Sequence, residues 1–406
     1  MNLTRTISLD EAHALPRWQQ PDVLLYVMAA AMPIAFATWS ALLNNFVIEI
    51  AGFTGREIGW LHSLREVPGF LAIGVIVVLW LLREQWLALL ALMLLGASTA
   101  VTALFPGFGG ILVVTMLSSI GFHYFETVNQ SLQLQWIDRE RAPETLGRVV
   151  AVGSAASLLA YGALVVTWKA FDLSYGFVYA VSGGATFVIA VLAALLYPQF
   201  QAREPQLKTF VLRRRYWLYY ALQMVAGARR QIFVVFAAFM MVEKFGFQVH
   251  EVTGLFLINF LANMALAPKM GKLVGRFGER RALIFEYAGL VVIFVLYGGL
   301  YWFDWPVWLA AALYVVDHIF FALAFAMRTY FQKIADPQDI APTAAVAFTI
   351  NHIAAVFLPA LLGYLWVQSP PLVFALAAGL ALCSMGLAFL IPRHPSKGHE
   401  TVLSSR

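Results

Sequence analysis

The sequence predicts an all-α membrane protein with twelve transmembrane helices in two six-helix bundles and with both termini in the cytoplasm. Composition, the spacing of apolar stretches and the distribution of basic residues carry this prediction. Of the 406 residues, 61% are hydrophobic and 12% are charged, against roughly 25% charged residues in soluble domains. Charged residues are too few to cover the surface of a soluble protein of this length, and the apolar character excludes disorder.

Motifs typical of soluble enzymes are missing from the sequence. Cys383 is the single cysteine, which excludes a disulfide framework and a cysteine metal cluster. The chain has no phosphate-binding Gly-x-x-x-x-Gly-Lys-Ser/Thr loop, no His-x-x-x-His pair and no Gly-x-Ser-x-Gly elbow. We therefore expect no enzyme activity, no cofactor, no metal site and no direct use of ATP.

A helix that crosses a bilayer needs about 20 mostly apolar residues. The sequence contains twelve such stretches, most of them separated by short turns that carry glycine or proline. The polar leader lacks an apolar core followed by a small-residue cleavage site, so we expect the first stretch to be a retained helix. The expected limits are 23–49, 58–82, 86–105, 110–136, 147–169, 175–197, 216–242, 252–270, 281–302, 306–331, 343–367 and 371–391.

Lysine and arginine residues lie mostly in loops on one side of this arrangement, which the positive-inside rule assigns to the cytoplasm. This bias favours an even number of crossings and cytoplasmic termini. The net charge of +5 therefore reflects topology, and we expect no nucleic-acid partner. The exceptions are Arg56, Lys169 and Lys244 in loops on the other side, and Arg65, Arg229 and Arg230 within hydrophobic segments.

The longest interior break, 199–215, is a basic linker that divides the helices into two sets of six. We expect a cytoplasmic leader at 1–22, bundles at 23–198 and 216–392, and a cytoplasmic tail at 393–406. The run from Arg213 to Arg215 is interpreted as a topological anchor, with a lipid-headgroup or regulatory patch as the alternative.

Two six-helix halves, cytoplasmic termini and a basic central loop resemble the major facilitator superfamily of secondary transporters. The loop expected at 271–281 is similar to that superfamily's Gly-x-x-x-Asp-Arg-x-Gly-Arg-Arg signature, although Gly275 replaces the acidic residue. The resemblance implies alternating access around a mid-membrane site lined by helices 1, 4, 7 and 10. It also favours a monomer in the plasma or inner membrane. The motif residues, whose glycines permit a tight turn and which are candidates for a conformational latch, are Gly271, Gly275, Arg276, Gly278, Arg280 and Arg281.

Polar residues at membrane depth indicate the candidate site, because such residues are retained mainly where they line a cavity or find a partner. In the fourth stretch, His123, Glu126, Gln130 and Gln133 follow i, i+3, i+7, i+10 spacing and share one helix face. Proton coupling or substrate binding is the functional interpretation of His123 and Glu126. A static interhelical hydrogen-bond pair is the alternative.

Arg229 and Arg230 lie near the middle of the seventh stretch. Adjacent residues point about 100° apart around a helix. We therefore expect one arginine to face the cavity and bind an anionic group, while the other pairs with a carboxylate on a neighbouring helix. The alternative is that both arginines neutralise Glu126 and Asp317 as structural ion pairs.

Asp317 and His318 in the tenth stretch are expected either to handle protons or to act as static partners of the arginines. Glu286 is close to Arg280 and Arg281 in the sequence and is interpreted as structural.

Near the outer surface, Arg65 is expected to pair with Glu49 or Glu66 and form an outer gate. An interfacial ion pair of little consequence is the alternative.

The sequence thus predicts a secondary active transporter that moves a small polar or anionic metabolite, coupled to protons. Efflux of drug-like or amphipathic compounds is the alternative, and a membrane-embedded enzyme or receptor is a remote one. The expected substrate-binding residues are Arg229, Arg230, Asn44, His123, Gln130 and Gln223, and the expected proton-coupling or ion-pair residues are Glu126, Asp317 and His318.

Overall fold

The computed structural model describes residues 6–71, 74–137, 142–201, 212–336 and 339–404. Contacts within the chain divide it into two compact units. Unit 1 comprises Met1–Gly52, Leu64–Leu207 and Val249–Gly254, and unit 2 comprises Phe53–Ser63, Lys208–Gln248 and Leu255–Arg406. Helices α3 (Gly55–Phe70) and α11 (Val249–Phe277) therefore contribute residues to both units.

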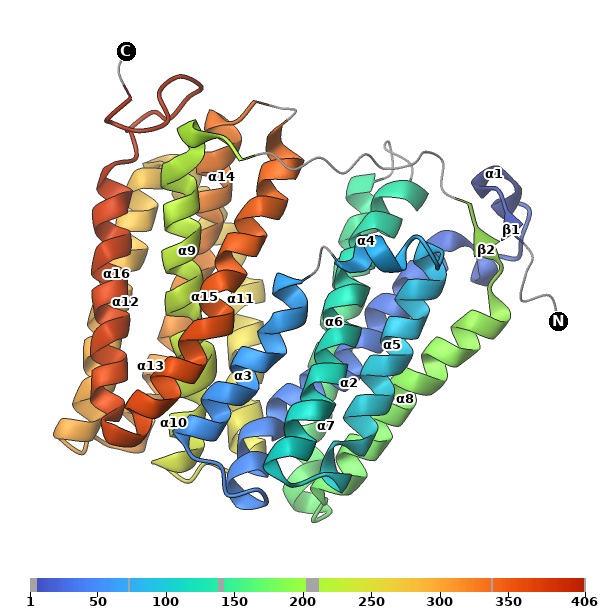
Figure 1. Ribbon diagram of the computed structural model, residues 1–406, viewed down its shortest axis with the longest axis horizontal. Helices are drawn as coiled ribbons and strands as arrows, with labels where there is room; N and C mark the ends of the chain where they lie inside the picture. Colours follow the sequence, from blue (N-terminus) through green and yellow to red (C-terminus); the bar gives the residue numbers. More distant parts are fainter. Residues whose placement is uncertain (1–5, 72–73, 138–141, 202–211, 337–338, 405–406) are drawn as a thin grey trace. The chain divides into compact units, whose positions relative to one another are not determined.

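Unit 1 is built on long helices with apolar sequences. Helix α5 packs against α6 and α8, and α2 packs against α7 and α8; the labels in Figure 1 locate these helices. A short parallel pairing of β1 with β2 matches Thr6 with Gln199 and Ile7 with Phe200. The elements are β1 Thr6–Ile7, α1 Leu9–Ala12, η1 Arg17–Gln19, α2 Pro21–Glu49, α4 Gly74–Val78, α5 Glu84–Val101, η2 Thr102–Leu104, α6 Phe108–Trp136, α7 Ala142–Ala170, α8 Tyr175–Leu196 and β2 Gln199–Phe200.

Unit 2 is also built on long apolar helices, but more of them are interrupted by short segments of another helix type. Helix α12 packs against α16, and α9 packs against α15 and α16. The elements are η3 Arg214–Tyr216, α9 Trp217–Gln231, the π-helix η4 Ile232–Ala237, α10 Ala238–Glu243, α12 Glu279–Trp302, α13 Val307–Phe321, η5 Ala322–Ala324, α14 Phe325–Ile334, α15 Ile340–Gln368 and α16 Pro370–Phe389.

Eleven helical segments in the described part of the chain are long and apolar enough to cross a membrane. The stretch expected at 58–82 is not one continuous span. Helix α3 ends at Phe70 after an internal proline, Pro68, and carries several charged side chains. The short helix α4 follows, and residues 72–73 lie outside the described residues. The count of twelve crossings and the cytoplasmic termini therefore stay predictions.

Two expected helices contain a change of helix type. The predicted span at 216–242 switches from α9 to a π-helix directly after Arg229, Arg230 and Gln231. The predicted span at 306–331 includes a short 3-10 segment between α13 and α14. A single π-turn within an α-helix often occurs at a functional site.

Glycines allow α5 and α8 of unit 1 to approach closely. A Cβ atom on Gly183 would lie 2.5 Å from the carbonyl oxygen of Gly96 and would also overlap the backbone nitrogen of Ala100. Small residues at such crossings allow van der Waals packing between helices in a bilayer. Close backbone contact therefore holds α5 against α8.

We expect Gly183→Ala to lower the thermal stability of the purified protein by several degrees, because α8 must move away from α5. Gly184→Ala is a matched control, since a Cβ atom there would have nothing within 4 Å and alanine favours the helix. Thermal unfolding in detergent measures both variants. Equal stability of the two variants would contradict the packing account.

Candidate functional site

The centre of unit 2 contains a buried ion pair between α9 and α12. Nη2 of Arg229 lies 3.1 Å from Oε1 of Glu286, and the two side chains are 1% and 0% exposed. The guanidinium carbon also lies 4.8 Å from the ring centre of Tyr287 and 5.9 Å from that of Phe321. Aromatic rings and a carboxylate thus surround a cation at membrane depth.

Asp317 on α13 is another fully buried acid of unit 2. Its side chain is fully buried, and neither carboxylate oxygen has a hydrogen-bond partner among the described residues. Arg229 and Glu286 are the charged groups within electrostatic range of Asp317. Phe321, four residues after Asp317 and on the same face of α13, lies 5.9 Å from the Arg229 guanidinium. This face of α13 therefore lies beside the ion pair, and the three side chains form a buried cluster of one cation and two acids.

Arg230 differs sharply from its neighbour. Its side chain is exposed, and it lies within electrostatic range of His318 on α13. Phe233, in the π-helix that follows, packs near Tyr314, His318 and Phe321. Arg230 therefore stands on the surface of unit 2 beside an aromatic cluster.

The structure identifies a partner for Arg229 that the sequence does not indicate. Sequence proximity makes Glu286 a companion of Arg280 and Arg281, whereas it is fully buried and pairs with Arg229. Asp317 makes no ion pair with Arg229 in the described structure, and Glu126 belongs to unit 1. Arg229 and Glu286 are 57 residues apart in the sequence, so no local spacing indicates that they form a pair.

Gln223 lies near the point where α9 meets α15. Its side chain donates to the hydroxyl of Tyr219 at 3.0 Å, and its backbone oxygen accepts from Asn351 Nδ2 at 3.1 Å. A Cβ atom on Gly227 would lie 2.5 Å from the carbonyl oxygen of Asn351. Gln223 is therefore engaged in packing this crossing.

In unit 1, the residues of the predicted polar face of α6 differ in exposure, and Gln133 at its end is half-buried. His123 is buried, Glu126 is half-buried and Gln130 is exposed. Gln130 lies within hydrogen-bonding reach of Glu126, one turn away. Asn129, beside this face, is buried and its Oδ1 has no hydrogen-bond partner among the described residues.

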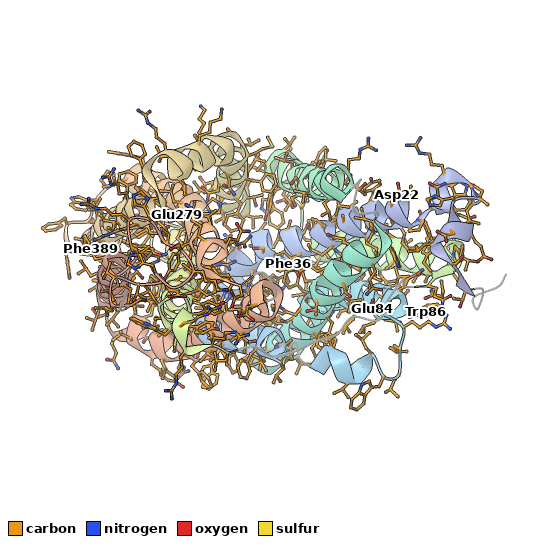
Figure 2. All side chains as sticks on the ribbon, turned by 90° about the horizontal axis from the view of Figure 1, so that it is seen from above. Asp22, Phe36, Glu84, Trp86, Glu279 and Phe389 are labelled. Atoms are coloured by element: carbon orange, nitrogen blue, oxygen red, sulfur yellow. The ribbon has the colours of Figure 1, made fainter. Side chains whose placement is uncertain are left out.

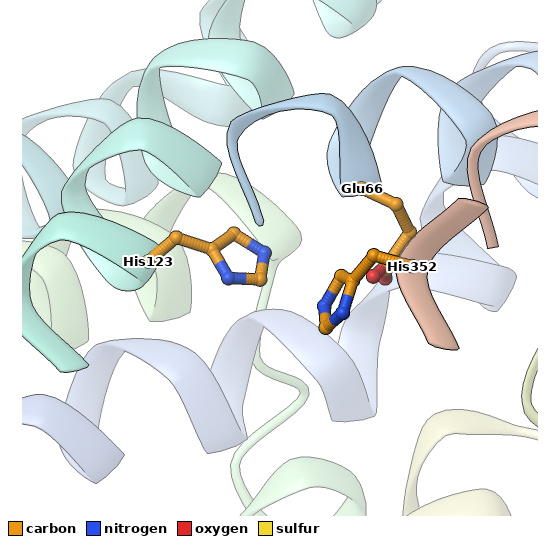
Figure 3. A group of neighbouring side chains, drawn as sticks. All are labelled: Glu66, His123 and His352. Atoms are coloured by element: carbon orange, nitrogen blue, oxygen red, sulfur yellow. The ribbon is translucent and has the colours of Figure 1, made fainter. Parts of the chain in front are cut away.

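His123 also lies close to Glu66 on α3. One ligand atom of His123 and one carboxylate oxygen of Glu66 are within 4.8 Å of one another, and Figure 3 shows the two side chains on their helices. The guanidinium of Arg65 pairs with Glu66 at 2.5 Å and lies 5.8 Å from the ring centre of Trp39. Of the two partners expected for Arg65, the structure has Glu66.

Glu49, the other expected partner, has different neighbours. Its carboxylate accepts hydrogen bonds from Asn45 at 3.1 Å and from the hydroxyl of Tyr175 at 2.6 Å. Glu49 therefore connects α2 to α8. Asn44, also on α2, is buried, and its Oδ1 has no hydrogen-bond partner among the described residues.

The loop motif is more helical than the sequence suggests. Helix α11 runs to Phe277, so Gly271 and Gly275 are helical, and the tight turn is made at Gly278, whose φ of +81° favours glycine. The guanidinium of Arg276 lies 5.5 Å from the ring centre of Phe277. Arg280 lies similarly, 5.9 Å from Phe389, which Figure 2 labels. Arg281 lies in the first turn of α12.

Acidic side chains that the sequence does not single out have specific partners. Glu84 on α5 accepts from Ser131 at 2.9 Å and from Gln135 at 2.6 Å. Glu279 pairs with Lys333 at 2.7 Å, and Figure 2 labels both acids. The sequence shows these two acids, but it does not show their partners, which lie on other helices.

The arginine run before α9 is held by two aspartates between α14 and α15. Arg213 Nη2 donates to Asp339 at 2.8 Å, and Arg215 pairs with Asp336. Lys397 in the C-terminal segment also pairs with Asp336, at 2.5 Å. Hydrogen bonds from Arg213 hold the pKa of Asp339 below its usual range, and those from Lys397 do the same for Asp336. The arginine run, which the sequence predicts to be a topological anchor, therefore also connects the start of α9 to the segment between α14 and α15.

Comparisons with known proteins agree on one fold. A profile of the Major Facilitator Superfamily matches residues 24–359 and 219–404. The nucleoside transporter NupG, solved as a point mutant, has a TM-score of 0.73 and 14% identity, covering 91% of this chain and 99% of its own. A bacterial homologue of the human lysosomal transporter Spinster has a TM-score of 0.67 and 13% identity, covering 91% and 95%. No curated protein sequence matches significantly.

We expect Arg229→Met to lower the free energy of unfolding by about 3–5 kcal/mol, because it leaves buried carboxyls without their cation. Arg230→Met, at the exposed neighbouring position, is the control and should change stability by less than about 0.5 kcal/mol. Denaturant unfolding in detergent measures both. A similar loss in the two variants would argue against a special role for the Arg229–Glu286 pair.

The ion pairs of Asp336 and Asp339, between α14 and α15, should make the stability of the protein depend on pH. Because the pKa of Asp339 is lowered in the folded protein, its contribution is present near neutral pH and is lost as pH falls below about 4. Asp339→Asn should therefore lower the thermal stability at neutral pH, with the difference from wild type shrinking in acid. Asp304→Asn, at an aspartate that is 93% exposed, is the control. A difference that stays constant with pH would contradict this.

Proposed function

This chain belongs to the Major Facilitator Superfamily, and we propose that it is a proton-coupled secondary transporter of a small polar or anionic metabolite. As a multi-pass membrane protein of this family, it would use alternating access to carry its substrate across the bilayer. We further propose a plasma or inner membrane location, cytoplasmic termini and a monomer.

The exposure of Arg230 carries the anionic part of the proposal. Arg229 is enclosed with Glu286, so its charge is used within unit 2. Arg230 stands exposed one position further along α9, and a guanidinium presents several donors that suit carboxylate or phosphate groups. Arg230 is therefore the arginine that we assign to substrate, and Arg229 is the one that we assign to structure.

Hydrogen-bonding and titratable groups complete the proposed set. Asn44, His123, Gln130 and Gln223 supply neutral polar groups for substrate. Glu126, Asp317 and His318 are the candidates for proton exchange, because acids and histidines within membrane helices often mark proton relays in transporters. Their roles rest on chemistry and position within each unit.

We expect Arg230→Ala to weaken the binding of an anionic substrate at least tenfold while leaving the protein folded. The reason is the loss of charge-assisted hydrogen bonds, each worth about 1.5–3 kcal/mol. A thermal-shift screen of the purified protein against a metabolite library would first identify ligands, and calorimetric titration of a ligand would then compare the variant with wild type.

The screen also separates the two transport hypotheses. Stabilisation by carboxylates or phosphates that disappears in Arg230→Ala would support the anionic substrate. Stabilisation by amphipathic cations alone, or unchanged anion affinity in Arg230→Ala, would refute it and would favour efflux of drug-like compounds. Arg230→Lys retains the charge but not the planar fork of donors, and we expect it to recover affinity only in part.

A further inference from the structure

We propose that Arg229, Glu286 and Asp317 form a buried triad that holds one exchangeable proton. This inference rests on the proposed function, because it assigns the proton of a proton-coupled transporter to a specific set of side chains. It replaces the broader choice among Glu126, Asp317 and His318 with a unit in which three helices, α9, α12 and α13, each contribute one residue.

The charge balance of the triad supports this assignment. With all three groups ionised, the cluster carries two negative charges and one positive charge in a region where each side chain is at most 1% exposed. An uncompensated charge in such surroundings is strongly unfavourable. One proton on the two carboxyls makes the cluster neutral.

The hydrogen-bond geometry shows which carboxyl is free to hold that proton. Glu286 already accepts from Arg229 through Oε1, whereas both oxygens of Asp317 lack hydrogen-bond partners among the described residues. Arg229 uses only Nη2 in this contact, and its Nε and Nη1 also lack partners there. The arginine therefore has spare donors for a second carboxylate.

Other titratable groups face the triad. Tyr287 and Tyr297 on α12 lie near its members, and Tyr314 on α13 lies near Tyr297. His318, next to Asp317 on α13, interacts with Arg230 of α9. A tyrosine is neutral near pH 7, so these rings leave the charge balance unchanged.

The triad then has two states. In the first state, Asp317 holds the proton. Arg229 and Glu286 then form a neutral ion pair, with the contact seen in the structure. When the O–H bond of Asp317 breaks, the proton passes to solvent that reaches the triad during alternating access. The new carboxylate, whose charge gives the triad a net charge of −1, then accepts hydrogen bonds from the spare donors of Arg229. Proton uptake reverses both steps, and no other bond forms or breaks.

Infrared spectroscopy of the purified full chain at neutral pH tests the triad without a substrate. A protonated carboxyl gives a carbonyl stretch that is distinct from the bands of a carboxylate. We expect Asp317→Asn to remove one protonated carboxyl from the wild-type spectrum. We also expect Glu286→Gln to remove it, because Asp317 would then be the only counter-ion of Arg229 and would ionise. A residue with a purely structural role at Glu286 would not produce this second effect.

Glu84→Gln is the matched control, because Glu84 is an acid of unit 1 with neutral hydrogen-bond donors and no proposed role in proton exchange; it should leave the triad's band unchanged. Retention of the band in Glu286→Gln, or its loss only in Glu84→Gln, would overturn the triad. If Asp317→Asn does not fold, Glu286→Gln alone decides. The expected spectra together with no gradient-driven uptake of any ligand would support the triad and refute the proposed function instead.

Discussion

A guanidinium that is buried at hydrocarbon depth is strongly unfavourable without a counter-charge, and this constraint organises unit 2. Arg229 meets it by pairing with Glu286, which requires α9 and α12 to lie together with their polar positions aligned. Because neighbouring residues point about 100° apart on a helix, enclosing Arg229 directs Arg230 elsewhere, and its side chain is exposed. One buried contact therefore separates a structural arginine from one that reaches the surface of unit 2.

Unit 1 satisfies its polar groups in a different way. Its acids accept hydrogen bonds from neutral side chains, as Glu49 does from Asn45 and Tyr175 and as Glu84 does from Ser131 and Gln135. Arg65 and Glu66, which are adjacent on one helix, pair with each other. The two units thus have similar apolar helices but unequal interiors. The pair of Glu126 and His123 in unit 1 and the pair of Asp317 and His318 in unit 2 therefore have different surroundings.

Sequence reasoning predicts the helices well because apolar length is a strong signal for crossing a bilayer. It fails where a local feature competes with length. Helix α3, which contains Pro68 and several charged residues, ends at Phe70, within the expected span at 58–82. Helix α11 continues through Gly271 and Gly275 and ends at Phe277, before the turn at Gly278. The pair of adjacent arginines predicts two different environments from helix geometry alone. The sequence does not predict that Arg229 pairs with Glu286, because Glu286 lies on α12, which does not follow α9 directly along the chain.

If the protein couples movement of a small polar substrate to protons, as we propose, a pH gradient must drive that movement. The most direct measurement is uptake of a ligand found by thermal shift into proteoliposomes under an imposed pH gradient. We expect accumulation that follows the gradient and that a protonophore abolishes, since dissipating the proton gradient removes the driving force. Equal uptake with and without the gradient would contradict proton coupling.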